Sequence, residues 1–290
     1  PAPGGRSTCL KNNKLCGSSV LEPGLDSEGV DRKTMDLPAS QNALIEQTIA
    51  ENPNTVVILI NGSPVAMPWI DQVPAVLEAW YPGMEGGTAI ANVLFGDANP
   101  CGKLPVTFPR QLGDSPAHQS ERSWPGDKQT VHYDEELLVG YRHFDKYDVA
   151  PLFPFGHGLS YTTFEYSDLQ ISADHFEGTD TLVASFQLNN RGDRDGAEVV
   201  QLYIRDEQAR EDRPLQSLKG FQKIYLKAGE TQRVEFTLPI KDLSIYCTPK
   251  GRWLIPSGNF TLCLGSSSKD TRLQTTFVIE KSNKHFEEAK

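Results

Sequence analysis

The first part of the chain alternates between helical and strand patterns. Residues 40–51 have apolar side chains at helical spacing (Leu44, Ile45 and Ile49, with Thr48 on the same face), and Ser40 can cap this helix. Residues 54–60, between Pro53 and Gly62, contain the uninterrupted apolar run Val56–Ile60. A strand that is apolar on both faces is typical of a parallel sheet covered by helices.

A second strand and helix follow at short spacing. We expect a strand over residues 75–80 and a helix that runs through Ala89–Phe95 and ends at Gly96. This alternation predicts an α/β domain over residues 25–110, built as a three-layer α/β/α sandwich with a mostly parallel sheet.

After Phe164 the period of the pattern changes to two. Turn sequences separate the alternating segments. The expected strands are 181–188, 198–204, 220–226, 231–238, 259–264 and one near 273–279. About seven short strands of this kind predict an all-β sandwich of the immunoglobulin or fibronectin III-like type over residues 165–290.

Two further segments lack clear periodicity. Residues 111–164 are rich in proline, glycine and aromatic side chains, and we interpret them as an extended linker that wraps around the first domain. Residues 1–24 are predicted to be an irregular N-terminal segment, either a fragment start or a processed end. The polar residues at the C-terminus are expected to be frayed.

Composition and charge narrow the possible partners. The formal net charge of -10 argues against nucleic acid, and no apolar run is long enough to span a membrane. No cysteine or histidine spacing matches a zinc site, so we expect no metal and no cofactor.

The five cysteines do not decide the compartment. Cys9 and Cys16 could close a small loop, and Cys247 and Cys263 lie on segments that could be neighbouring strands. Unpaired cysteines are an equally good interpretation. We expect a secreted or extracellular protein, with a cytoplasmic location as the alternative.

Three stretches carry candidate chemistry. The first is the loop 25–32, where Asp26, Glu28 and Asp31 lie beside Arg32 just before the first clear helix. Loops at the edge of a parallel sheet commonly handle ligands. The charge pattern alone, however, favours a solvated acidic loop.

The second candidate is Glu85, at a glycine-rich helix start, where a favourable interaction with the helix dipole is the preferred interpretation. The third combines residues 131–136 with residues 141–144, which offer histidine, aspartate and tyrosine side chains. Packing between domains is the favoured interpretation of this stretch and of His157. A Gly-x-Ser-x-Gly elbow is absent from the sequence, so an esterase has no support.

Several motifs occur in order along residues 25–280. The first is Ser27-Glu28-Gly29-Val30-Asp31-Arg32, followed by Met35-Asp36-Leu37-Pro38. The others are NTVVILINGSP (54–64), WYPGMEGG (80–87), VLFGDANPCGKLPVTF (93–108) and PLFPFGHGLSYTTF (151–164). In these motifs the chain resembles glycoside hydrolase family 3, whose acid/base loop is similar to the first of them. The second half resembles the fibronectin III-like domain found in many β-glucosidases.

This resemblance implies the C-terminal portion of a retaining β-glucosidase that acts on a β-glucoside or oligosaccharide. Glu28 would be the general acid/base, with Asp31, Arg32 and Glu85 as supporting residues. The aspartate nucleophile would come from an N-terminal (β/α)8 barrel, in the same precursor or in another chain. Because the mechanism needs two carboxyl groups, this chain alone is expected to be inactive.

The N-terminal region departs from the family pattern. An apolar strand is expected just before the Glu28 loop, but residues 1–24 are rich in glycine, proline, asparagine and lysine. This departure keeps open an alternative from another class of protein. The chain would then be a non-catalytic carbohydrate-binding or scaffold protein derived from a degenerate hydrolase.

Overall fold

The computed structural model describes residues 9–11, 14–16, 33–38, 40–127, 129–209 and 213–280. These fall into two compact units, which are considered separately. The first contains the described residues up to Val57 together with Val65–Val76. The second contains Ile58–Pro64 and the described residues from Leu77 onward. The first unit begins with a hairpin of β1 (Cys9–Lys11) and β2 (Lys14–Cys16), in which Cys9 and Cys16 occupy opposite positions.

Helix α1 (Gln41–Glu51) forms where the helical pattern predicts it, with Ser40 at the N-cap position. The Ser40 side chain makes no capping hydrogen bond. Ile49 is buried, whereas Leu44 is 60% exposed, so the predicted apolar face is only partly covered. The fully buried Trp69 anchors the helix, because its Nε1 donates a hydrogen bond to Asn42 Oδ1 at 2.9 Å.

Strands β3 (Val56–Leu59) and β4 (Ala75–Glu78) form a two-stranded sheet. The side chains of β3 alternate between exposed and buried, with Val57 and Leu59 inside and Val56 and Ile58 outside. The expectation that this strand is buried on both faces is therefore wrong for this chain. Helix α2 (Gly86–Phe95) ends as predicted at Gly96, whose φ of 82° is the left-handed geometry that favours glycine.

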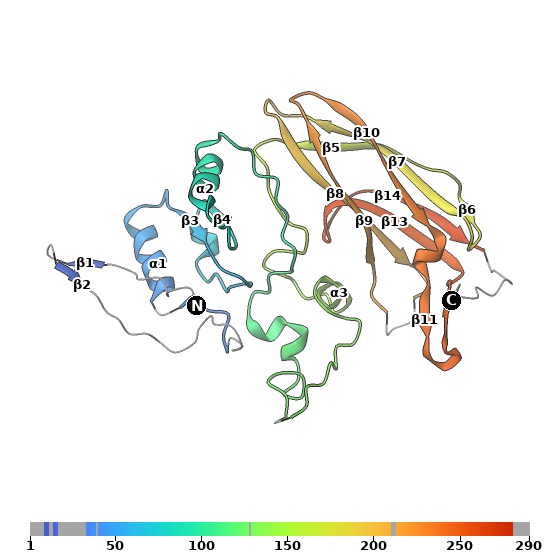
Figure 1. Ribbon diagram of the computed structural model, residues 1–290, viewed down its shortest axis with the longest axis horizontal. Coiled ribbons are helices and arrows are strands. Elements are labelled where there is room, and N and C mark those ends of the chain that lie inside the picture. Colours follow the sequence, from blue (N-terminus) through green and yellow to red (C-terminus); the bar gives the residue numbers. More distant parts are fainter. Residues whose placement is uncertain are drawn as a thin grey trace. The chain divides into compact units, whose positions relative to one another are not determined.

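The second half is the predicted β-sandwich (Figure 1). One sheet has the order β10-β7-β5 and the other has the order β6-β14-β13-β8-β9. The strands are β5 (Phe164–Ile171), β6 (His175–Phe176), β7 (Thr181–Asn190), β8 (Gly196–Asp206), β9 (Ser217–Leu226), β10 (Thr231–Pro239), β13 (Gly258–Ser267) and β14 (Asp270–Ile279). A small hairpin of β11 (Ile245–Cys247) and β12 (Arg252–Leu254) extends from them.

All six predicted strands are present, and both sheets contribute to one apolar core. Leu182, Leu188 and Phe186 of β7 are fully buried, as are Leu262 and Leu264 of β13. Strand β5 was not predicted. Its alternation is interrupted where Asp168 has a φ of 56° and the register with β7 shifts between Ser167 and Gln170, as in a β-bulge.

The segment before the sandwich is fastened to it by specific polar contacts. Lys103 Nζ lies 2.9 Å from Glu198 Oε1 of β8, and it also donates a hydrogen bond to Gly158 O at 3.0 Å. Gln201, also on β8, donates hydrogen bonds through Nε2 to Gly156 O (3.2 Å) and Ser266 O (2.7 Å). A Cβ at Gly156 (φ 81°) would overlap the Gln201 amide, which explains the glycine in this turn.

The possible disulfide between Cys247 and Cys263 is not formed. Cys247 lies on β11, which pairs with β12, whereas Cys263 lies on β13 opposite Tyr203 and Gln274. Burial raises the pKa of the Cys263 thiol. For Cys247 and Cys263 the unpaired interpretation is correct, whereas the side chains of Cys9 and Cys16 lie outside the described part of the chain, and their possible bridge stays a prediction.

No helix in the described part of the chain is both long and apolar enough to cross a membrane.

Candidate functional site

The principal predicted site residues, Glu28, Asp31 and Arg32, lie outside the described residues. The same holds for Asp26 and for residues 17–24 ahead of the loop. Their roles remain predictions based on the sequence.

Glu85 occupies the N-cap position of α2, at the helix start where it was predicted. Its Oε2 accepts a hydrogen bond from Thr88 Oγ1 at 3.3 Å, and its side chain does not cap the helix backbone. The neighbouring Met84 is 98% exposed. An exposed carboxylate at this end of a helix interacts favourably with the helix dipole, and the role of Glu85 stays a prediction.

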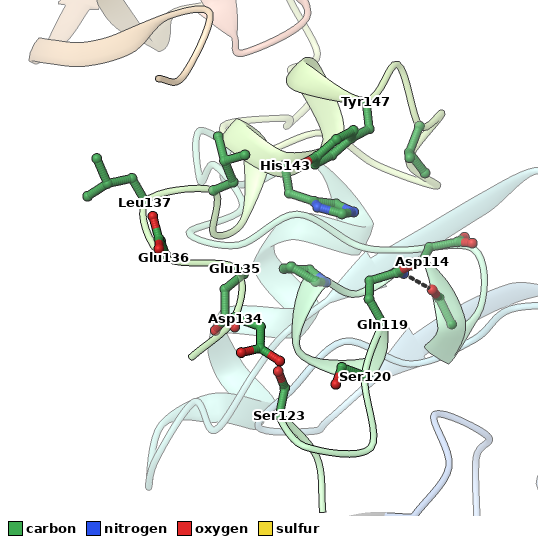
Figure 2. A pocket seen from close by; sticks show the side chains of 14 residues that line it. Asp114, Gln119, Ser120, Ser123, Asp134, Glu135, Glu136, Leu137, His143 and Tyr147 are labelled. Atoms are coloured by element: carbon green, nitrogen blue, oxygen red, sulfur yellow. Dashed lines mark hydrogen bonds between the residues drawn. The ribbon is translucent and has the colours of Figure 1, made fainter. Parts of the chain in front are cut away.

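The third predicted stretch lines a cavity of about 740 Å³ (Figure 2). One wall consists of the irregular segment 113–123, and the other consists of residues 134–138 together with helix α3 (Tyr141–Lys146) and the residues after it. The lining residues are Gly113, Asp114, Pro116, Gln119, Ser120, Ser123, Asp134, Glu135, Glu136, Leu137, Leu138, His143, Tyr147 and Val149.

Hydrogen bonds within the segment 113–123 fix the first wall. Asp114 accepts hydrogen bonds from Gln111 through both carboxylate oxygens, from the backbone N at 3.2 Å and from Nε2 at 3.0 Å. Gln119 Nε2 donates to the carbonyl of Gly113, and Ser120 Oγ accepts from Arg122 N at 3.1 Å. These contacts order a segment that has no regular secondary structure beyond two short 3-10 turns.

The second wall carries the carboxylates that the sequence singled out. Asp134 faces Arg122, with 3.9 Å between Oδ1 and Nη2, and Arg122 also contacts His132 Nδ1 at 3.1 Å. Backbone hydrogen bonds from Glu136 N to Tyr133 O (3.0 Å) and from Leu138 N to Glu135 O (2.8 Å) form the turn. The turn places Glu135 and Glu136 at the cavity.

Helix α3 links this cavity to the sandwich. Tyr141 Oη accepts a hydrogen bond from Leu218 N at 2.9 Å, and its ring stacks on Phe155 at 5.1 Å. The buried Asp145 accepts from Gln216 Nε2 at 2.8 Å and lies 2.9 Å from Lys269 Nζ. This half of the stretch therefore packs as the favoured interpretation expected, while His143 on the same helix reaches the cavity (Figure 2).

Three histidines are held in surroundings that disfavour their charged form. Burial lowers the pKa of His118 and of His143, and it lowers the pKa of His157 together with the positive charge of Lys103. The His157 ring stacks on Phe153 at 5.2 Å, which supports the structural role expected for it.

These histidines should make the protein less stable in acid. The unfolded chain protonates its histidines at about pH 6.5, before the folded protein does, so the free energy of unfolding should fall as the pH drops below this value. Each histidine contributes at most about 1.4 kcal/mol per pH unit. Urea unfolding between about pH 7.5 and 5.5 should show a smaller decrease in a variant with all three replaced by glutamine. Equal pH dependence in both proteins would contradict this assignment.

Within the described ranges, no three His, Cys, Asp or Glu side chains are placed to hold a metal ion. The available chemistry at the cavity is hydrogen bonding and apolar contact.

The sequence did not single out Asp114, Gln119 or Ser123, because the segment that carries them has no periodic pattern.

Two known protein families match this chain, one mainly ahead of the β-sandwich and one within it. Residues 9–161 match the glycosyl hydrolase family 3 C-terminal domain, and residues 198–268 match the fibronectin type III-like domain. Thermostable beta-glucosidase B of Acetivibrio thermocellus is 44% identical over 259 residues, which cover 89% of this chain and 34% of that protein. A beta-glucosidase of Rhizobium radiobacter is 43% identical over 255 residues, which cover 88% of this chain and 31% of that protein.

Solved structures show the same relationship. DesR, a beta-glucosidase from Streptomyces venezuelae in complex with D-glucose, superposes with a TM-score of 0.82 at 39% identity, over 87% of this chain and 32% of that one. A family 3 beta-glucosidase from Bifidobacterium adolescentis superposes with a TM-score of 0.84 at 38% identity. The superposition covers 91% of this chain and 38% of that one. The chain spans about a third of the length of these relatives. It belongs to glycoside hydrolase family 3, of which it represents a C-terminal portion, the α/β domain followed by the fibronectin type III-like domain.

Proposed function

We propose that this chain works as the C-terminal portion of a retaining β-glucosidase and supplies its general acid/base, Glu28. The observation that carries the proposal is the collinear match of nearly the whole chain to β-glucosidases. The loop Ser27-Glu28-Gly29-Val30-Asp31-Arg32 lies within residues 9–161, which match the family's C-terminal domain, and it resembles the motif of the family acid/base.

The chemistry requires a partner for Glu28. In a retaining mechanism one carboxyl group attacks the sugar, while the other protonates the departing oxygen and later deprotonates the incoming water. The proposed source of the nucleophile is the barrel that precedes this region in such enzymes. The substrate proposed for the assembled enzyme is a β-glucoside with a terminal glucosyl unit.

The experiment is a domain replacement in the Acetivibrio thermocellus relative. Its own C-terminal third is exchanged for this chain, and hydrolysis of 4-nitrophenyl β-glucoside is measured. The intact relative is the positive control, and the 290-residue chain alone is the negative control. We expect activity in the chimera and none from the chain alone. A folded chimera without activity, or an active isolated chain, would contradict the proposal.

A further inference from the structure

The cavity between residues 113–123 and 134–149 contains polar groups that the fold leaves unused. Ser123 is 6% exposed, and its hydroxyl has no hydrogen-bond partner among the residues that the structure describes. Figure 2 shows this hydroxyl pointing toward Asp134 along the cavity wall. A buried hydroxyl without a partner is costly, so a ligand that bonds to it would recover free energy.

The charges around the cavity are partly compensated. Of its four carboxylates, Asp114 is bonded to Gln111 and Asp134 faces Arg122. Glu135 has an Oε2 atom that is buried without a partner in the described part of the chain, and Glu136 is exposed. None of the lining residues is a lysine or arginine, which disfavours an anionic ligand.

His143 adds a donor and an acceptor to these groups. It is 7% exposed and reaches the cavity from α3. Because burial lowers its pKa, the ring is neutral near pH 7 and offers one nitrogen of each kind. Donors and acceptors interspersed in this way suit hydroxyl groups, which both donate and accept, better than they suit a simple cation.

Most of the remaining lining residues are apolar. Pro116, Leu137, Leu138, Tyr147 and Val149 supply surfaces for the C–H groups of a ligand. Small-molecule sites have volumes of roughly 300–1,000 Å³ and combine a few polar groups with such surfaces. The cavity volume of about 740 Å³ lies within that range.

We infer that this cavity binds a neutral polyhydroxylated ligand, a sugar ring whose hydroxyl groups bond to Ser123, Glu135 and His143. The choice of a sugar among polyhydroxylated ligands rests on the proposed function. The hydrogen-bonding requirement comes from the cavity itself.

Direct binding to the full 290-residue chain tests the inference. Cellobiose and glucose are titrated into the protein and followed by calorimetry and ligand-observed NMR. Ser123→Ala and Glu135→Gln should each weaken cellobiose binding roughly 5- to 30-fold, the cost of one lost hydrogen bond. Glu46→Gln, an exposed change on α1, is the matched control and should bind like the parent chain.

A stability measurement separates binding from a structural role. Because the Ser123 hydroxyl has no partner in the described part of the chain, Ser123→Ala should leave the urea midpoint unchanged or raise it. A lowered midpoint would assign the hydroxyl to the fold and overturn the inference. Absence of saturable sugar binding, unchanged binding in both cavity variants, or uptake of spermidine but of neither sugar would also overturn it.

Sugar binding by the isolated chain is measured independently of glucoside hydrolysis by the chimera. If the isolated chain binds cellobiose and the chimera is inactive, the proposed function fails and the cavity assignment stands. If the chimera is active and neither cavity variant changes sugar binding by the chain, the cavity assignment alone fails.

Discussion

Replacing Glu28 with glutamine in the active chimera should lower kcat/KM for cellobiose by roughly 10²- to 10⁴-fold, the usual contribution of general acid–base catalysis. Glutamine keeps the size of the side chain but can neither protonate the departing oxygen nor deprotonate water. Initial rates of glucose release give the measurement. Glu46→Gln, on the exposed surface of α1, serves as the control for nonspecific loss.

The leaving group distinguishes an acid/base from a residue that only supports the loop. A dinitrophenyl group departs without protonation, so formation of the glycosyl-enzyme should be almost unaffected by Glu28→Gln, whereas its hydrolysis should be slow. The intermediate should accumulate, and added azide should accelerate turnover by forming glucosyl azide. An equal rate loss for cellobiose and for the dinitrophenyl glucoside, with no response to azide, would show that Glu28 is not the acid/base.

The sandwich was predictable because burial on one face imposes a period of two. Strand β10 (Thr231–Pro239) illustrates this, since Val234, Phe236 and Leu238 are buried and the residues between them are exposed. Helix α2 was predictable for a similar reason, because Gly96 ends a short apolar run. In both elements the signal is local and needs no knowledge of distant residues.

The cavity was only half predictable. The second wall was found because charged and aromatic residues cluster in one stretch, with Asp134 and His143 nine residues apart. Ser123 and Gln119 gave no signal, because hydrogen bonds to particular carbonyls and turns, rather than a periodic pattern, position their segment. The resemblance to a family singled out Glu28 as the predicted acid/base, whereas the charge pattern alone indicated a solvated loop.

Long-range polar contacts were likewise invisible in the sequence. Asn99 illustrates this: its Nδ2 donates to Asp195 O at 3.0 Å, and its Oδ1 accepts from Ser160 Oγ at 2.9 Å and Tyr161 N at 2.8 Å. A single side chain thus joins segments that lie about sixty and a hundred residues farther along the chain. Such contacts depend on the completed fold, so no local sequence pattern predicts them.

Replacing Lys103 with methionine should lower the free energy of unfolding by roughly 3–5 kcal/mol. The side chains of Lys103 and Glu198 are only 12% and 10% exposed, and their charged atoms are 2.9 Å apart. Methionine keeps most of the apolar length of lysine but leaves the Glu198 carboxylate buried, with the Val199 N–H at 2.8 Å as a remaining hydrogen-bond donor. The Gly158 carbonyl also loses the hydrogen bond from Lys103.

An exposed ion pair in the same unit supplies the matched control. Arg191 Nε lies 2.6 Å from Glu165 Oε2, but the side chains are 62% and 49% exposed, so Arg191→Met should cost no more than about 1 kcal/mol. Urea unfolding of both variants measures the difference.

The double variant Lys103→Met with Glu198→Leu should recover much of the loss, because it removes the uncompensated charge. Equal costs for the two single variants would show that burial does not determine the importance of the Lys103–Glu198 pair. A double variant no more stable than Lys103→Met would place the loss in packing or in the Gly158 contact, rather than in the carboxylate.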